Sequence, residues 1–64
     1  MRTTAFRRMM ADEFGNARAD MIAGSHVFAD LGGTTVNQAL AAGAPPKQIW
    51  LAVCEAFDVP AERR

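Results

Sequence analysis

Few side chains in this 64-residue sequence could take part in chemistry, and they lie far apart along the chain. Cys54 is the only cysteine and His26 the only histidine, and no third residue is placed to orient them as a nucleophilic pair. A four-ligand zinc site would also need added carboxylates. His26 and Asp30 have the spacing of a charged pair on one helix face. We therefore expect no catalytic residues, no cofactor and no metal, and hence a non-enzymatic protein.

Composition limits the remaining possibilities. A chain of 64 residues forms one small domain, 1–64, and with a single cysteine it has no intrachain disulfide. Seven basic and seven acidic residues cancel, which removes the usual electrostatic reason to expect a nucleic-acid partner. The N-terminal residues carry too many charges for a membrane span or a secretory segment. We expect a cytoplasmic protein that does not associate with membranes.

Apolar spacing predicts two helices in the first half of the chain. The first covers about residues 4–14 and places one apolar face at Phe6, Met9, Met10 and Phe14. The second covers about residues 17–31, with a heptad-like register of Ala17, Met21, Phe28 and Leu31 and with Gly24 in the seam. Glycine costs a helix about 1 kcal/mol relative to alanine, and Ser25 could cap a new turn. This helix is therefore either continuous or broken at residues 24–25.

The second half of the chain predicts a helical hairpin. Thr35 and Gln38 have the spacing of a capping box, and Gly43 followed by Pro45-Pro46 ends one helix and begins the next. We expect helices at about residues 35–42 and 46–57, followed by a frayed tail at residues 61–64. No segment alternates with a period of two residues. The fold class is therefore all-α, a compact bundle of about four short helices.

The same hairpin has the spacing of a DNA-reading helix-turn-helix. Ala39, Gly43 and Ile49 would provide the close helix crossing, the turn and the apolar anchor of that motif. Any tight helical hairpin needs the same three features, however. On the second helix only Lys47 and Gln48 could read a base edge. A purely structural hairpin is the better interpretation, with DNA reading as the alternative.

The predicted partner-binding residues lie on the first and last helices. They are Arg7, Arg8, Lys47, Gln48 and Leu51. Helical geometry places Leu51 on the polar side of its helix, so we expect it to be partly exposed. One exposed leucine is compatible with a monomer, or with a weak homodimer closed by a self-complementary patch. Another protein is the expected partner.

Several short motifs distributed over nearly the whole chain resemble one family. They are Leu31-Gly32-Gly33, Ala39-Leu40-Ala41-Ala42-Gly43, Pro46-Lys47 and the run from Trp50 to Pro60. Together they are similar to an actinobacterial family of proteins of unknown function, number 3046. The resemblance implies a small helical protein with no assigned activity, often encoded near recombinase genes. Leu51 departs from this pattern, because relatives usually carry arginine there. We expect a protein-protein interaction module; the alternative is a DNA-associated accessory protein linked to recombination or repair.

Overall fold

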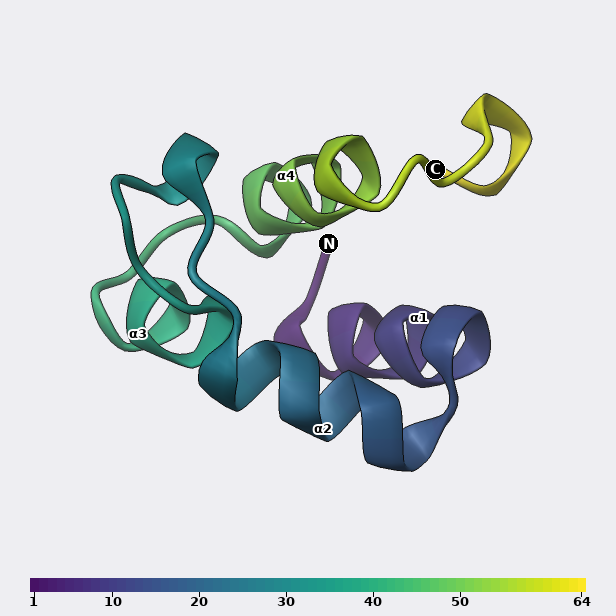
Figure 1. Ribbon diagram of the computed structural model, residues 1–64, viewed down its shortest axis with the longest axis horizontal. Coiled ribbons are helices and arrows are strands. Elements are labelled where there is room, and N and C mark those ends of the chain that lie inside the picture. Colours follow the sequence, from purple (N-terminus) through teal and green to yellow (C-terminus); the bar gives the residue numbers. More distant parts are fainter.

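Four α-helices form close to the positions that spacing and turn residues predict. The computed structural model describes residues 1–64 and contains α1 (Thr3–Phe14), α2 (Asn16–Ser25), α3 (Val36–Ala41) and α4 (Pro46–Ala56) (Figure 1). Two short 3-10 turns, η1 (Ala29–Leu31) and η2 (Ala61–Arg63), complete the secondary structure. The predicted all-α class is confirmed, because the only β feature is one isolated bridge.

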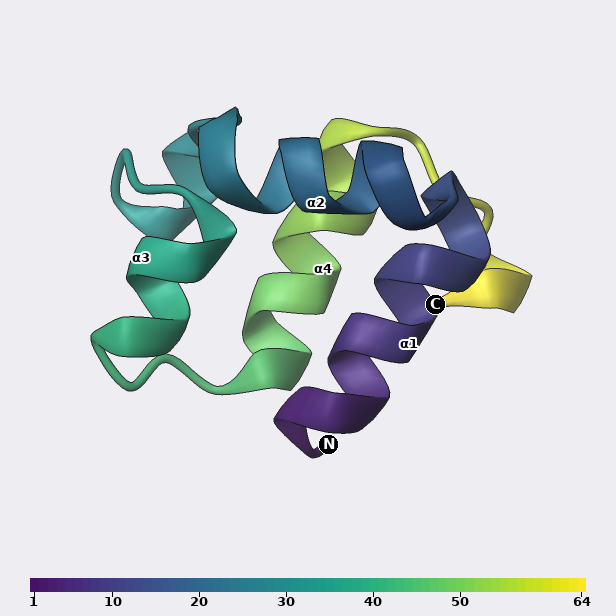
Figure 2. The ribbon, with the colours of Figure 1, turned by 90° about the horizontal axis from the view of Figure 1, so that it is seen from below.

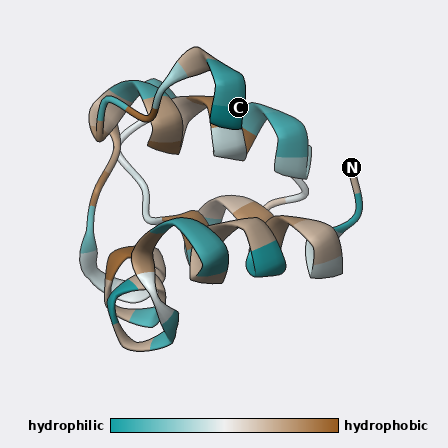
Figure 3. Ribbon diagram, turned by 90° about the vertical axis from the view of Figure 1, so that its right-hand side faces the viewer, coloured by the Kyte–Doolittle hydropathy of each residue, from teal (hydrophilic) through white to brown (hydrophobic).

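The helices surround one core. Figure 1 shows α4 on the side of the molecule opposite α1 and α2, and Figure 2 shows α3, α4 and α1 in a row with α2 running across them. α4 contacts α1, α3 and η1, while α2 contacts α1 and α3. Each helix mixes hydrophobic and hydrophilic residues along its length (Figure 3), as expected when only one face of each helix is buried.

Trp50 is the largest side chain of the core and joins α4 to α1. Its indole is 1% exposed and meets the Phe6 ring edge-on, with 6.4 Å between the ring centroids. No protein group accepts a hydrogen bond from its Nε1. Around this pair lie the other buried members of the core: Met10, Ala19, Ile22, Ala23, Phe28, Val36, Ala39, Ile49, Val53, Cys54 and Val59. Phe6 and Met10 come from the face predicted for the first helix, and the core position of Cys54 also agrees with its sequence context.

α2 is shorter than the predicted 17–31 helix and buries a different face. It ends at Ser25, so the chain takes the broken alternative at residues 24–25. The predicted register is wrong, because Met21 is 62% exposed and the buried residues are Ala19, Ile22 and Ala23. The heptad depended on Phe28 and Leu31, which lie beyond the end of the helix. Without them, the i, i+3, i+4 stripe of smaller residues faces the core.

A tight loop follows α2 and returns the chain to α3. The Phe28 N–H donates to the Thr34 carbonyl at 3.0 Å, and the Gly33 N–H donates back to the Phe28 carbonyl at 3.0 Å. Between them Gly32 and Gly33 have φ values of 74° and 80°, a region in which side chains are strained. These two glycines therefore allow the loop to close and Phe28 to reach the core.

The predicted helical hairpin is confirmed with slightly shorter helices. Thr35 accepts from the Gln38 N–H at 3.2 Å, and the Gln38 side chain accepts from the Thr35 N–H at 3.0 Å, so the capping box is complete. Gly43 turns the chain with a φ of 89°, and Pro46 begins α4. The helices cover 36–41 and 46–56 where the sequence predicts 35–42 and 46–57, because the flanking residues serve as caps.

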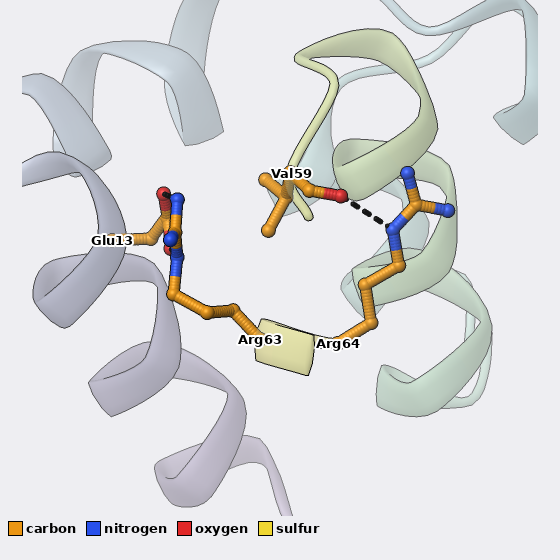
Figure 4. A network of polar contacts seen from close by, with 4 residues as sticks. All are labelled: Glu13, Val59, Arg63 and Arg64. Carbon is orange, nitrogen blue, oxygen red and sulfur yellow. Dashed lines mark hydrogen bonds and ion pairs between the residues drawn. The ribbon is translucent and has the colours of Figure 1, made fainter. Parts of the chain in front are cut away.

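The last residues form a tied turn where the sequence predicts a frayed tail at 61–64. Arg63 makes two hydrogen bonds to the Glu13 carboxylate of α1, at 2.8 and 3.1 Å. Arg64 points the other way and donates from Nε to the Val59 carbonyl at 2.7 Å (Figure 4). Its guanidinium also pairs with Glu55 of α4 at 3.2 Å. Composition gave no signal for these ties, because they join residues far apart in sequence.

Two glycine substitutions should change stability in opposite directions. Gly33→Ala should lower the free energy of unfolding by about 1–2 kcal/mol through backbone strain alone, because its new Cβ would meet no atom within 4 Å. Gly24→Ala is the matched control, since Gly24 is helical and its Cβ would meet Asn37 Nδ2 at an ordinary 3.8 Å. It should raise the free energy of unfolding by about 0.5–1 kcal/mol. Thermal unfolding followed by circular dichroism measures both, and shifts of the same sign would contradict this account.

The tie between Glu13 and Arg63 should make stability depend on acid pH. The hydrogen bond from Arg63 lowers the pKa of Glu13 below its ordinary value of 4.5. Stability from such a group is present above the unfolded pKa and lost as the pH falls through the lower folded pKa. We expect the urea midpoint to fall in this acid range, and Glu13→Gln to remove part of that fall. Asp12→Asn is the control, because Asp12 forms no ion pair. The prediction would be wrong if Glu13→Gln left the fall of the urea midpoint at acid pH unchanged.

Candidate functional site

Two surface hollows meet at His26, where α2 ends. The first has a volume of about 240 Å³ and lies between residues 26–30 and the second half of α4. The second, of about 300 Å³, lies between α2 and Phe57. We call the surface that contains both hollows the His26 face. Its lining residues are Arg18, Met21, Ile22, Ser25, His26, Val27, Phe28, Ala29, Asp30, Ala52, Glu55, Ala56 and Phe57.

Aromatic rings support this face from below. The imidazole of His26 packs against Phe28 and Phe57, with ring centroids 4.5 and 5.1 Å apart, respectively. Phe57 also meets Phe14 of α1 edge-on at 5.4 Å. The Arg18 guanidinium lies over these two rings, 5.7 Å from the centroid of Phe14 and 6.0 Å from that of Phe57. The cluster fixes His26 between the two hollows.

Large apolar side chains are exposed around the hollows. Met21 is 62% exposed and Val27 is 57% exposed, which makes them the two most exposed large hydrophobic residues of the chain. Each lines one of the two hollows that share His26. Single exposed apolar residues are common, but here they occur beside hollows with aromatic walls. The arrangement can accept apolar side chains from outside.

Charge divides the His26 face into two halves. Arg18 lines the hollow that contains Met21, whereas Asp30 and Glu55 line the hollow that contains Val27. The pairing of His26 with Asp30 that helical spacing would allow is absent, because α2 ends at Ser25 and no helix joins the two residues. His26 instead takes an extended backbone and stacks on the phenylalanines.

The predicted arginines of α1 lie away from the His26 face. The Arg7 guanidinium donates to Asn37 Oδ1 of α3 at 2.7 Å, so Arg7 links two helices. Arg8 is exposed and lines a separate hollow of about 490 Å³ on α1 with Thr4 and Asp12. The two arginines therefore line different hollows, neither of which belongs to the His26 face.

The predicted residues of α4 lie on its exposed side. Lys47 and Gln48 are exposed, and the expected partial exposure of Leu51 is confirmed at 44%. Leu51 lies one turn before Glu55 on α4, but it does not line the hollow that contains Val27. None of the five predicted partner-binding residues lines the hollows of the His26 face.

The residues that could do chemistry are not assembled. Cys54 is fully buried, and burial raises the pKa of its thiol, which opposes formation of the reactive thiolate. His26 is exposed and packs among phenylalanines. No group of three or more His, Cys, Asp or Glu side chains has the arrangement of a metal site. No helix has both the length and the apolar character required to cross a bilayer.

Sequence reasoning missed the His26 face because it assigned Met21 to a buried seam. The point at which α2 ends would have indicated that Met21 is exposed. Once the helix ends at Ser25, Met21 lies opposite the buried stripe of Ala19, Ile22 and Ala23. Val27 then lies in an extended segment, where alternation puts its side chain opposite that of buried Phe28.

One family model matches residues 1–62, and its description is "Protein of unknown function (DUF3046)". The match covers all four helices and reaches into η2. No curated protein and no solved structure matches the chain.

Proposed function

The chain belongs to the family of proteins of unknown function DUF3046, and we propose that it is a non-enzymatic protein-binding module of the cytoplasm that docks its partner on the His26 face. The observation that carries the proposal is the exposure of Met21 and Val27 in the two hollows that share His26. Interfaces concentrate apolar and aromatic side chains at their centre and charged groups at their rim. The His26 face has this composition, with Arg18 and Glu55 at its edges.

The size of the molecule supports binding over catalysis. Small-molecule sites usually enclose about 300–1,000 Å³ with convergent polar groups, whereas the hollows of the His26 face, at about 240 and 300 Å³, lie below and at the lower end of this range and have mostly apolar walls. Such hollows suit single side chains of a partner. The single buried cysteine suits a reducing compartment, which supports the cytoplasm as the place of action.

Crosslinking from cells that naturally produce the protein tests this proposal. We expect the protein to enrich a specific partner, and Met21→Asp combined with Val27→Asp to reduce the capture at least tenfold, because charge opposes burial at an interface centre. Arg8→Glu combined with Lys47→Glu is the matched control and should retain capture. Helicity measured by circular dichroism must be unchanged in both variants.

Two outcomes would contradict the proposal. Absence of any partner enriched over the doubly substituted Met21 and Val27 variant would refute binding through the His26 face. Loss of capture only in the Arg8 and Lys47 variant would show that the partner binds the surface of α1 and α4 predicted from sequence and not the His26 face. A homodimer would appear as crosslinking of the chain to itself, and Leu51→Arg would then be expected to weaken it.

DNA association is the second candidate function, and the hairpin of α3 and α4 favours it. Ala39 and Ile49 are buried at 6% and 0% exposure, and Gly43 forms the turn, as a helix-turn-helix requires. Lys47 and Gln48 are exposed at the start of the second helix. The zero net charge opposes this function, because affinity for DNA comes largely from contacts to phosphate.

A salt titration distinguishes this second function. If the protein binds duplex DNA through Lys47, its affinity should fall steeply between low and physiological salt, and Lys47→Glu should weaken binding further. Glu55→Gln should strengthen binding, since it removes a charge that repels phosphate. Failure to bind duplex DNA at low ionic strength, measured by fluorescence anisotropy, would exclude the function.

A further inference from the structure

The hollow beside Val27 has the size of one long side chain. Its volume of about 240 Å³ is below the usual range of about 300–1,000 Å³ for small-molecule pockets. It forms where the loop after α2 rises towards α4 (Figure 1), and η1 contacts α4 directly. The bridge of Phe28 to Thr34 holds one wall, and α4 forms the other. Both walls are thus built before any partner binds.

The inner surface of this hollow is apolar. Phe28 and Ala52 are only 2% and 7% exposed, so they close the floor of the hollow and add little accessible area to it. Ala29 and Ala56 add small side chains that leave space open. A methylene chain laid against these groups would lose contact with water and gain dispersion contacts.

The rim of the hollow is negatively charged. Asp30 and Glu55 both line it, and Asp30 forms no ion pair. The Glu55 side chain is 70% exposed and pairs with the Arg64 guanidinium at 3.2 Å. Arg64 does not line the hollow, and its ion pair offsets part of the charge of Glu55, so Asp30 is the carboxylate of the hollow without a cationic partner. His26, the other titratable group of the hollow, packs against Phe28 rather than against either carboxylate.

We propose that this hollow binds a lysine or arginine side chain of the protein partner, with the methylene stem against the apolar wall of Val27, Ala29 and Ala56 and the cation at the rim that carries Asp30 and Glu55. This inference rests on the proposed protein-binding function and specifies the chemistry of the partner. Long basic side chains combine an apolar stem with a charged head, which matches apolar walls below an acidic rim. The exposed Val27 offers contact to apolar neighbours of the basic residue.

Three small probes with the same four-carbon chain test the inference by NMR. n-Butylguanidinium, n-butanol and n-butanesulfonate carry positive, zero and negative charge, and each is titrated at constant pH and ionic strength. n-Butylguanidinium should shift the amides of Val27 to Asp30 and of Ala52 to Ala56. Its affinity should exceed that of n-butanol roughly 3- to 10-fold, the range expected for one or two solvent-exposed charge pairs. n-Butanesulfonate should bind more weakly than n-butanol.

Matched variants separate the charge effect from the apolar contact. Asp30→Asn combined with Glu55→Gln should reduce the affinity for n-butylguanidinium to that for n-butanol, while Asp12→Asn on α1 should leave it unchanged. Equal affinities of the unsubstituted protein for the three probes would overturn the basic partner and leave a neutral docking face. Shifts confined to other amides would overturn the hollow as the site. Neither result decides whether a partner exists, which the crosslinking experiment determines independently.

Discussion

The packing of Trp50 against Phe6 is the contact on which the rest of this small structure depends. It joins the last helix to the first across most of the chain, and both side chains are almost fully removed from water. A domain of this size buries few large side chains, so a single aromatic pair accounts for much of its apolar contact. With α4 fixed in this way, its opposite flank becomes a wall against which the loop after α2 can form the His26 face.

Local signals accounted for most of the fold. The capping box of Thr35 and Gln38, the glycine turn at Gly43 and the apolar face of α1 depend on neighbours within one or two turns, so the sequence predicts them well. The register of α2 was wrong because the pattern extended past Ser25 into a loop. That loop closes through two consecutive glycines with positive φ and through the backbone bridge between Phe28 and Thr34. The spacing of apolar residues predicts neither feature.

The candidate site was less predictable than the fold, for a physical reason. Its hollows form between segments that are separate in sequence, as when Val27 and Ala52 come to line one cavity. A helical wheel can identify an exposed residue such as Leu51, but it cannot show which other element lies beside it. Arg7 illustrates the same limit, because only the fold shows its hydrogen bond to Asn37.

The tie between Glu13 and Arg63 has a consequence for the order of folding. It closes a loop of 50 residues, whereas the helices and their caps close within a few residues. Loop-closure entropy makes long-range contacts slow to form unless other contacts have already brought the segments together. The ion pair of Glu13 and Arg63 should therefore form after the core in the folding reaction and be absent from the transition state. Loss of this ion pair would then speed unfolding modestly and leave the rate of folding nearly unchanged.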